Sequence, residues 1–451
     1  MTVADAVQRL TSHMPDSSGY ALPYAEVREM QLAALDQRLQ QQVDRIKLVR
    51  LRAEEAGISR ISTLADAVPL LLPHTAYKSY PESFLTGGKW AMLTKWLATV
   101  SACPTDGVDL SGVADLDGWI AACGKAGLLV SSSSGTTGKA AMLVATQEDL
   151  DFAAQAQVAA VQWGSAIREG DMRTPAGPAG VGAHTPRNIA SGGCMMKAFT
   201  DPAAPRFQTG LPPATIGSLT AMVMLRKKIA DGTAQPSEIA AFEAESAARA
   251  QGLAAAQVGA VEDVIAKRDQ RLFITGMWGA LHPFAEAVRA RGFSGKDFHP
   301  ENAVYLGGGL KGAQLPADYQ QFVFDTFNLH PPYIYRMYSM QELNSPMSRC
   351  SAGRYHIPPW VVCLPLDKSG DHLLDIGGEE IEARAAFFDL SLEGGWGGVI
   401  SGDRIHVSFA PCECGHASPS IRDNIDRYAN IEGDDKIACS GTVDAYVRGM
   451  S

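Results

Sequence analysis

Cysteine, basic charge and long apolar runs are all scarce in this 451-residue chain. Its eight cysteines are too few for a disulfide framework, so a reducing, cytoplasmic location is the default expectation. The sequence has no apolar run of about 18 residues, so we expect no membrane span, and its N-terminus MTVADAVQRL lacks a signal-peptide core. The 39 Lys and Arg residues are outnumbered by 49 Asp and Glu, and a net charge of -10 argues against nucleic-acid binding.

The apolar pattern predicts an α/β fold. Through residues 127–306, short apolar stretches alternate with helical periodicity, which indicates mostly parallel sheets flanked by helices. From about residue 334, short stretches separated by turns, including 398–400 and 404–409, predict a smaller β-barrel-like lobe. Residues 168–212, rich in Gly and Pro, are expected to form loops. The predicted parts are an α/β core over 1–333 with a helical insertion at about 214–268, a β-rich lobe over 334–425 and a short remnant over 426–451.

A loop rich in small hydroxylated residues is the clearest motif. Residues 130–141 have the sequence VSSSSGTTGKAA and follow a predicted buried strand. Glycine lets backbone N–H groups approach an anion, hydroxyls bond phosphate oxygens, and Lys139 offsets their charge. The predicted phosphate-binding residues are Ser133, Ser134, Gly135, Thr136, Thr137, Gly138 and Lys139. A glycine- and serine-rich connection that binds nothing is the alternative.

This loop is not a P-loop of the Walker type, which requires G-x-x-x-x-G-K-[ST]. Ser133 stands where the first glycine is needed, and Ala140 where the magnesium-binding hydroxyl is needed. The order S-S-G-T-T-G-K instead resembles the phosphate loop of adenylate-forming enzymes, which activate carboxylic acids with ATP. Ala141 stands where that family usually has a basic residue, so we expect Lys139 to carry that role.

Further motifs resemble the same superfamily. The sequence YSMQE, residues 338–342, is similar to its Y-G-x-T-E motif, with Ser339 in place of the glycine. The resemblance implies that the Tyr338 ring lies beside adenine and that Glu342 helps to hold Mg²⁺, as suits a flat ring and a hard oxygen ligand. Asp403 in Ser-Gly-Asp is implied to accept hydrogen bonds from ribose. The backbone beside adenine would be Gly307, Gly308 and Gly309. Each match alone is also compatible with an ordinary turn.

Cysteine and histidine recur at metal-ligand spacing in the β-rich lobe. The predicted ligands are Cys350, His356, Cys412 and Cys414. Thiolates and an imidazole suit tetrahedral zinc, and a site closed by four protein ligands would be structural. Cys363 and His416 are fallback ligands. Four unrelated residues are the alternative, because cysteine is often simply buried.

Together, the motifs over roughly residues 70–430 resemble the branch of adenylate-forming enzymes that contains phenylacetate–CoA ligases and bacterial acyl-protein synthetases. The resemblance implies a hinge at Arg427, six residues after Ile421. It also implies an acyl-carrying thiol at Cys439, because acyl-protein synthetases carry the acyl group on a cysteine near the C-terminus. Only residues 428–451 follow Arg427, so we expect most of the C-terminal domain of such enzymes to be missing.

We expect an enzyme that uses ATP and Mg²⁺, with structural Zn²⁺, to convert a small-molecule carboxylic acid, whether aryl, fatty or small and polar, to an acyl-adenylate. The catalytic residues implied by the resemblance are Lys139, Glu342, Arg427 and Cys439. The acyl group would pass to a thiol (CoA, a carrier or a protein cysteine) or to an amine. A nucleotide- or acyl-adenylate-binding protein with reduced catalysis is the main alternative, and a purely structural partner-binding protein is the third hypothesis. A homodimer is an open option for its assembly.

Overall fold

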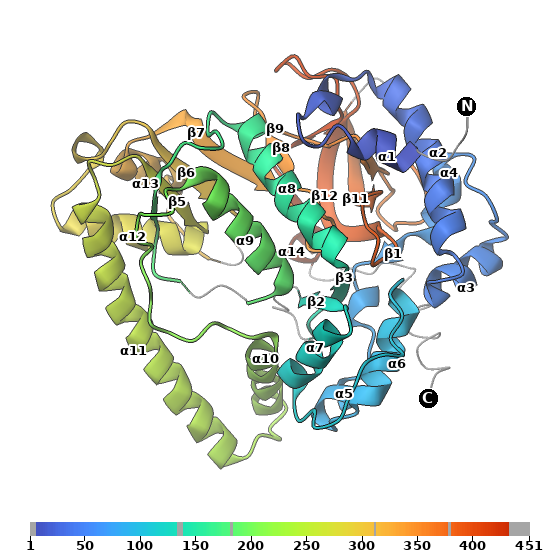
Figure 1. The fold of residues 1–451 in the computed structure, drawn as a ribbon, viewed down its shortest axis with the longest axis horizontal. Helices are drawn as coiled ribbons and strands as arrows, with labels where there is room; N and C mark the ends of the chain where they lie inside the picture. The colour runs from blue at the N-terminus through green and yellow to red at the C-terminus, as the bar shows by residue number, and fades with distance from the viewer. Residues whose placement is uncertain (1–5, 133–138, 181–183, 311–312, 378–379, 433–451) are drawn as a thin grey trace. The chain divides into compact units, whose positions relative to one another are not determined.

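The computed structural model describes residues 6–132, 139–180, 184–310, 313–377 and 380–432 (Figure 1). The chain forms two compact units. Unit 1 comprises Met1–Ala159, Thr185–Arg187 and Ser339–Ser451, and unit 2 comprises Ala160–His184 and Asn188–Tyr338. The three parts predicted above have different boundaries and stay a prediction.

Unit 2 is built on a parallel sheet. Its strands, in spatial order, are β4 (Thr174–Ala176), β5 (Leu272–Gly276), β6 (Asn302–Leu306) and β7 (Leu329–Tyr338). Its helices are α9 (Pro186–Phe199, whose first two residues belong to unit 1), α10 (Ile216–Ala230), α11 (Pro236–Ala266), α12 (Trp278–Ala290) and α13 (Tyr319–Phe327). Parallel strands need long crossover connections, and these helices supply them.

Helices cover both faces of this sheet because the side chains of β5 alternate between the faces. Leu272 and Ile274 lie in an apolar cluster with buried residues of α11, α12 and α13. Phe273, between them, points to the opposite face, where its ring lies 5.7 Å from that of Phe199 on α9. Burial on both faces explains why the strand is a continuous apolar run.

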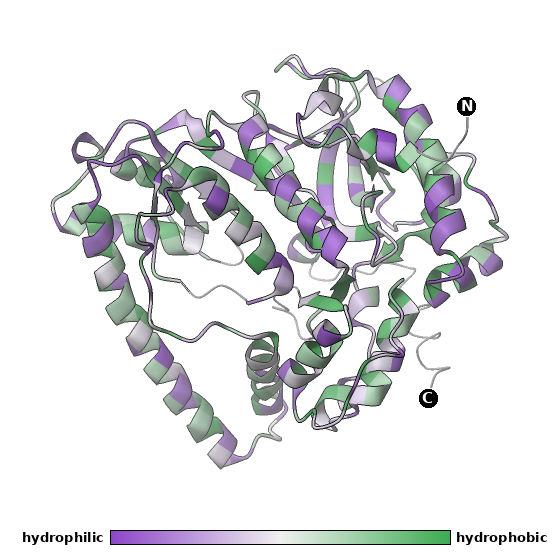
Figure 2. Cartoon of the chain, in the orientation of Figure 1, coloured by the Kyte–Doolittle hydropathy of each residue, from purple (hydrophilic) through white to green (hydrophobic). Residues whose placement is uncertain are grey.

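The helices α10 and α11 form a helical hairpin where the sequence predicts a helical insertion, at about 214–268 (Figure 1). An ion pair of 2.8 Å between Lys228 and Glu238 joins them near the turn. Only the end of α11 is buried, at Ala256, Ala260, Val261 and Val264. The rest mixes polar and apolar residues along its length (Figure 2).

Unit 1 combines helices with antiparallel strands. Its helices are α1 (Ala6–Thr11), α2 (Tyr24–Gln42), α3 (Lys47–Ala56), α4 (Leu64–Ala67), α5 (Glu82–Thr86), α6 (Trp90–Val100), α7 (Leu116–Lys125), the start of α8 (Gln147–Gly164) and α14 (Tyr428–Glu432), and the 3₁₀ turns are η1 (Ser18–Ala21), η2 (Val68–Leu70) and η3 (Ala76–Lys78). Its strands are β1 (Leu72–Pro73), β2 (Leu129–Ser132), β3 (Met142–Ala145), β8 (Met347–Arg349), β9 (Arg354–His356), β10 (Val361–Cys363), β11 (Ile381–Asp389), β12 (Gly398–Ser408), β13 (Ser420–Arg422) and β14 (Asp426–Arg427).

The long strand β12 lies at the centre of unit 1. It pairs antiparallel with β11, β13 and β14 and parallel with β1. Between the pairs Arg384–Arg404 and Ala386–Ile400, three residues of β12, Ser401–Asp403, lie opposite one residue of β11, so β12 is bulged there. Residues 398–400 and 404–409 were predicted as two strands, but the structure has one bulged strand over Gly398–Ser408.

The predicted α/β class is confirmed, with a parallel sheet flanked by helices in unit 2 and the β-rich part in unit 1. The prediction of loops over 168–212 is wrong in part, because β4 and α9 lie there. Burial of Met195 and Phe199 outweighs the low helix propensity of Gly192 and Gly193. Among the described residues, no helix has both the length and the apolar character needed to cross a bilayer.

Candidate functional site

The predicted phosphate loop is described only where it leaves and rejoins the β2–β3 pair. Its residues Ser133, Ser134, Gly135, Thr136, Thr137 and Gly138 lie outside the described residues. Tyr80 holds the exit of the loop, because its hydroxyl donates to the Ala140 carbonyl at 2.7 Å. The Lys139 ammonium donates to the Tyr80 carbonyl at 2.7 Å and lies 5.3 Å from the centroid of the Tyr80 ring. The predicted phosphate-binding cation thus contacts the segment between β1 and α5.

Two of the predicted site residues are paired across neighbouring strands. Asp403 on β12 lies opposite Arg427 on β14 in the antiparallel register. Arg427 Nε is 3.3 Å from Asp403 Oδ1, and the side chains are 68% and 10% exposed, respectively. An ion pair this open to solvent adds at most about 1 kcal/mol to stability. Its structural effect is to fix the buried carboxylate at a defined place on β12.

The third predicted residue, Glu342, lies in the turn after β7 and is half-buried. Burial raises the pKa of its carboxyl above the ordinary value, and Asp403 raises it further. Lys78 and Arg187 oppose this shift, because their positive charges favour the carboxylate. Glu342 therefore interacts electrostatically with Asp403 and with two cations, Lys78 and Arg187, that no motif marks. We call Glu342, Asp403, Arg427, Lys78 and Arg187 the acid–cation site.

Arg187 fixes the chain directly after Glu342. Its guanidinium donates to the Leu343 carbonyl at 2.5 Å and to Asn344 Oδ1 at 2.8 Å. The Asn344 N–H in turn donates to Asp389 Oδ2 at 2.7 Å. Buried polar groups need such partners, so these bonds set the backbone of the turn. Sequence reasoning missed Arg187 because an arginine that follows a proline at a helix start matches no motif.

The residues predicted to lie beside adenine belong to unit 2. Gly307, Gly308 and Gly309 follow β6, and Tyr338 ends β7. These strands are parallel neighbours, with Leu306 opposite Arg336, so their carboxyl ends lie at one edge of the sheet. Gly308 has a φ of +75°, which a residue with a Cβ rarely adopts. Ligands of open α/β sheets bind at this edge. Ser339, directly after Tyr338, is exposed and begins the last part of unit 1.

The four predicted metal ligands come together in unit 1. We call Cys350, His356, Cys412 and Cys414 the Cys–His cluster, and their candidate ligand atoms all lie within 4.8 Å of one another. The two sulfurs of Cys350 and Cys412 are 3.9 Å apart, and Cys414 Sγ is 3.3 Å from His356 Nε2. Tetrahedral zinc with bonds of about 2.3 Å to sulfur would hold two sulfurs about 3.8 Å apart. The donor types and spacing fit a closed zinc site.

Tight turns and a second hydrogen-bonding layer hold this cluster. The Gly353 N–H donates to the Cys350 carbonyl at 3.0 Å, and the Gly415 N–H donates to the Cys412 carbonyl at 2.9 Å. His356 Nδ1 lies 2.7 Å from Ser418 Oγ, which orients the other ring nitrogen toward Cys414. Of the two fallback ligands, His416 Nδ1 is 3.5 Å from Cys414 Sγ. Cys363, on β10, is not a member of the cluster.

Burial sets the protonation of the cluster. Burial, with the neighbouring Cys412 and Cys350 thiols, raises the pKa of Cys414 to about 12. Burial, together with His416 and Arg354, lowers the pKa of His356 to about 4. A neutral imidazole is the form that binds a metal, and a bound cation would stabilise the thiolates. The remaining predicted cysteine, Cys439, lies outside the described residues.

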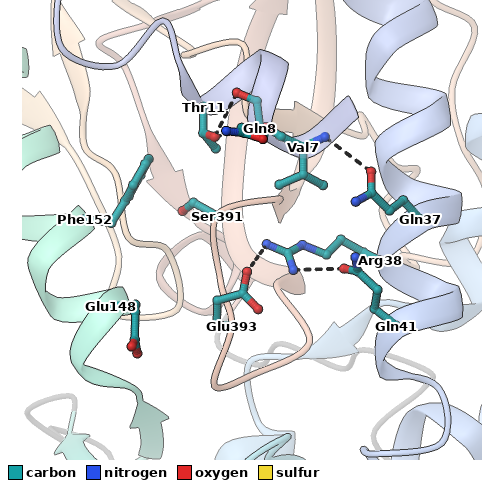
Figure 3. Close-up of a pocket in the computed structure, with 10 residues that line it drawn as sticks. All are labelled: Val7, Gln8, Thr11, Gln37, Arg38, Gln41, Glu148, Phe152, Ser391 and Glu393. Carbon is teal, nitrogen blue, oxygen red and sulfur yellow. Dashed lines mark hydrogen bonds and ion pairs between the residues drawn. The ribbon is translucent and has the colours of Figure 1, made fainter. Parts of the chain in front are cut away.

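A separate hollow of about 320 Å³ opens in unit 1 between α1, α2, α8 and residues 391–393 (Figure 3). Arg38 crosses it, with an ion pair of 2.6 Å to Glu393 and a hydrogen bond of 3.1 Å to Gln41. The Arg38 guanidinium also donates to the Leu390 carbonyl at 2.7 and 2.9 Å. None of the residues that line this hollow was predicted as a site residue.

The arrangement of strands and helices is that of the adenylate-forming ligases. The chain is similar to two solved structures of 2-hydroxyisobutyryl-CoA ligase in the postadenylation state, one in complex with R3-HIB-AMP and one with 2-HIB-AMP. In the first, 14% of residues are identical, the TM-score is 0.53, and the match covers 93% of this chain and 70% of that one. In the second, 13% of residues are identical, the TM-score is 0.52, and the match covers 91% of this chain and 69% of that one. No family model and no curated protein matches the sequence.

Proposed function

We propose that this protein activates a carboxylic acid with ATP as an acyl-adenylate and passes the acyl group to a thiol. The observation that carries the proposal is the acid–cation site, in which Glu342 interacts with Asp403 and two cations in a chain with the fold of adenylate-forming ligases. A half-buried carboxyl with a raised pKa suits a cation ligand, because a divalent ion favours the charged form. The two similar solved structures are of 2-hydroxyisobutyryl-CoA ligase in the postadenylation state, in complex with R3-HIB-AMP and with 2-HIB-AMP, which favours the same class of chemistry.

Each residue has a defined part in this proposal. Glu342 would hold Mg²⁺, which neutralises phosphate charge when bound. Asp403, fixed by Arg427, would accept hydrogen bonds from the ribose hydroxyls. Lys139 and the loop 133–138 would bind phosphate oxygens, which requires the Lys139 ammonium to leave the Tyr80 carbonyl or to serve both. Tyr338 and the glycines 307–309 would border adenine.

The proposed acceptor is CoA, with a carrier thiol, a protein cysteine such as Cys439 or an amine as the other options. A thiolate is a competent acyl acceptor. A reducing cytoplasm is the proposed location, and it would keep Cys439 and the other thiols from forming disulfides. We propose a homodimer as the assembly, because dimers are the commonest oligomers. We also propose that the chain belongs to the branch of adenylate-forming enzymes that contains phenylacetate–CoA ligases and acyl-protein synthetases.

We further propose that the Cys–His cluster binds one structural Zn²⁺. The support is the distance of 3.9 Å between two sulfurs, the imidazole at 3.3 Å from the third sulfur, and the Ser418 partner of His356. A site closed by four protein ligands leaves no open position for a substrate. This metal would therefore stabilise the fold of unit 1 rather than take part in adenylation.

Two observations favour a second function. The Lys139 ammonium already bonds the Tyr80 carbonyl, and Ser339 and Gln341 replace the usual glycine and threonine of the family motif. A protein that binds a nucleotide or an acyl-adenylate without turnover would tolerate both features. It would bind ATP with the same residues and would release no pyrophosphate.

Acid-dependent exchange of labelled pyrophosphate into ATP separates these functions. With aryl, fatty and small polar acids as a panel, the proposed enzyme exchanges label with at least one acid and not without acid. Nucleotide binding by calorimetry with no exchange across the panel would establish the second function instead. The absence of both would overturn the proposed ATP site.

A further inference from the structure

Lys78 is a half-buried lysine that belongs to no motif. It ends η3, which follows β1 directly. The strand β1 runs parallel to β12, with Pro73 opposite Ile400. Because the two strands run in the same direction, residues 74–80 leave the sheet at the end of the pairing from which β12 continues to Asp403. The fold thus brings a segment from early in the chain to the predicted ribose-binding residue.

Buried side chains and hydrogen bonds fix the backbone around Lys78. The neighbouring Tyr77 and Tyr80 are 6% and 0% exposed. The Tyr80 hydroxyl donates to the Ala140 carbonyl at 2.7 Å, and the Tyr80 carbonyl accepts from Lys139 Nζ at 2.7 Å. The segment of Lys78 is therefore joined to β12 on one side and to the exit of the predicted phosphate loop on the other.

The charges that face Lys78 are those of the acid–cation site. Burial lowers the pKa of its ammonium, Glu342 raises it and Arg427 lowers it. Among the described residues, no side chain or carbonyl forms a hydrogen bond with the Lys78 ammonium, whereas Lys139 already donates to a carbonyl. Within the described part of the chain, the Lys78 ammonium therefore has donors to offer a ligand, and a flexible ammonium suits a phosphate oxygen.

We propose that Lys78 contacts the reacting phosphate and offsets its charge during adenylation, an inference that rests on the proposed function. In this step a carboxylate oxygen of the acid forms a bond to the α-phosphorus. The bond from that phosphorus to the bridging oxygen breaks, and its electron pair leaves with pyrophosphate. Both reactants are anions and no proton is transferred, so a fixed ammonium lowers their repulsion as the new bond forms. Lys78 is a catalytic residue in this account.

The test compares three variants in the pyrophosphate exchange assay. Lys78→Met keeps the length of the side chain and removes its charge, and we expect kcat to fall about 100-fold, the loss typical of one charge-stabilising donor. The KM values for ATP and acid should change far less, because the contact strengthens as the bond forms. Lys78→Arg should recover much of the rate. Lys95→Met, an exposed lysine on α6, is the matched control and should exchange at the wild-type rate.

Thermal unfolding of each variant separates a catalytic loss from a folding defect. The proposal requires Lys78→Met to unfold near the wild-type temperature while its exchange falls. Exchange at the wild-type rate in Lys78→Met overturns the role of Lys78 and leaves acid activation standing. An equal loss in Lys78→Arg and Lys78→Met, with normal unfolding, also overturns it, because shape and not charge would then matter. If the wild-type protein shows no pyrophosphate exchange with any acid of the panel, acid activation is overturned, and the inference about Lys78 with it.

Discussion

The Cys–His cluster and the acid–cation site lie in the same unit and differ in how far the sequence identifies them. All four predicted ligands of the cluster meet, with ligand atoms within 4.8 Å of one another. The sequence marks Glu342, Asp403 and Arg427 in the acid–cation site but not Lys78 or Arg187. Cysteine is rare and its spacing is informative, whereas lysine and arginine are common and most of them are solvated. The spacing of rare residues thus predicts a candidate metal site more completely than it predicts a site built from common charged residues.

The two sites share one electrostatic property. Burial raises the pKa of an acidic group in each, that of Cys414 to about 12 and that of Glu342 above its ordinary value. In each group burial therefore disfavours the charged form, which a bound cation would stabilise. The difference is in the partners. The acid–cation site provides cations from the protein, while the Cys–His cluster has thiols and an imidazole that a metal would join.

Replacement of Glu342 should have the largest effect. Glu342→Gln keeps the shape and removes the negative charge that would hold Mg²⁺, so we expect pyrophosphate exchange to fall at least about 100-fold. Metal content should stay unchanged, because Glu342 is not part of the Cys–His cluster. Glu54→Gln, an exposed acid on α3, is the control and should leave exchange as it is. Exchange near the wild-type rate in Glu342→Gln would remove this residue from the site.

Arg187 should matter most for stability. Arg187→Met leaves the Leu343 carbonyl and Asn344 Oδ1 without donors, so we expect the free energy of unfolding in urea to fall by about 3 kcal/mol. Arg427→Ala is the matched comparison. That arginine is 68% exposed, and its loss should lower the free energy of unfolding by less than about 1 kcal/mol. Equal losses for the two arginines would contradict the difference in burial on which this prediction depends.

Replacement of a predicted zinc ligand should affect the protein less than replacement of Glu342 or Arg187. Cys412→Ser should abolish zinc binding, measured by elemental analysis, and lower the unfolding temperature by about 5 °C, since bound metal stabilises the fold. Cys194→Ser, a half-buried cysteine on α9, should keep the metal. Purified wild-type protein that binds no zinc after exposure to it would show that the cluster is only a group of buried side chains.

Much of the fold followed from local patterns. The alternation of apolar runs and helical periodicity over 127–306 predicted the strands and helices found there, including β5 and β6, and the helical insertion at about 214–268 corresponds to α10 and α11, because a repeat of two or 3.6 residues is a property of neighbouring positions. The helix α9 was missed because Gly192 and Gly193 disfavour a helix, while the packing of Phe199 against Phe273 depends on a distant strand. The turn expected at Ser401–Asp403 is part of β12, where these three residues form a bulge opposite the single residue Ala385 of β11.

The same difference between local patterns and distant contacts explains which site residues could be predicted from the sequence. The Cys–His cluster has two ligands in each of two short segments, so the sequence contains most of its geometry. Arg187 contacts Leu343, 156 residues away, and nothing near Arg187 indicates that partner. The charges of Lys78 and Arg427 act on one another because β1 and β14 both pair with β12. Such contacts between distant segments become visible only in the folded chain.

The most direct test of acid activation follows the oxygen atoms of the substrate. An acid that supports exchange is labelled with ¹⁸O in its carboxyl group and incubated with ATP and a thiol acceptor, and the nucleotide product is weighed by mass spectrometry. An acyl-adenylate intermediate predicts AMP that carries one ¹⁸O atom from the acid. Unlabelled AMP, or ADP with phosphate as the products, would contradict the account.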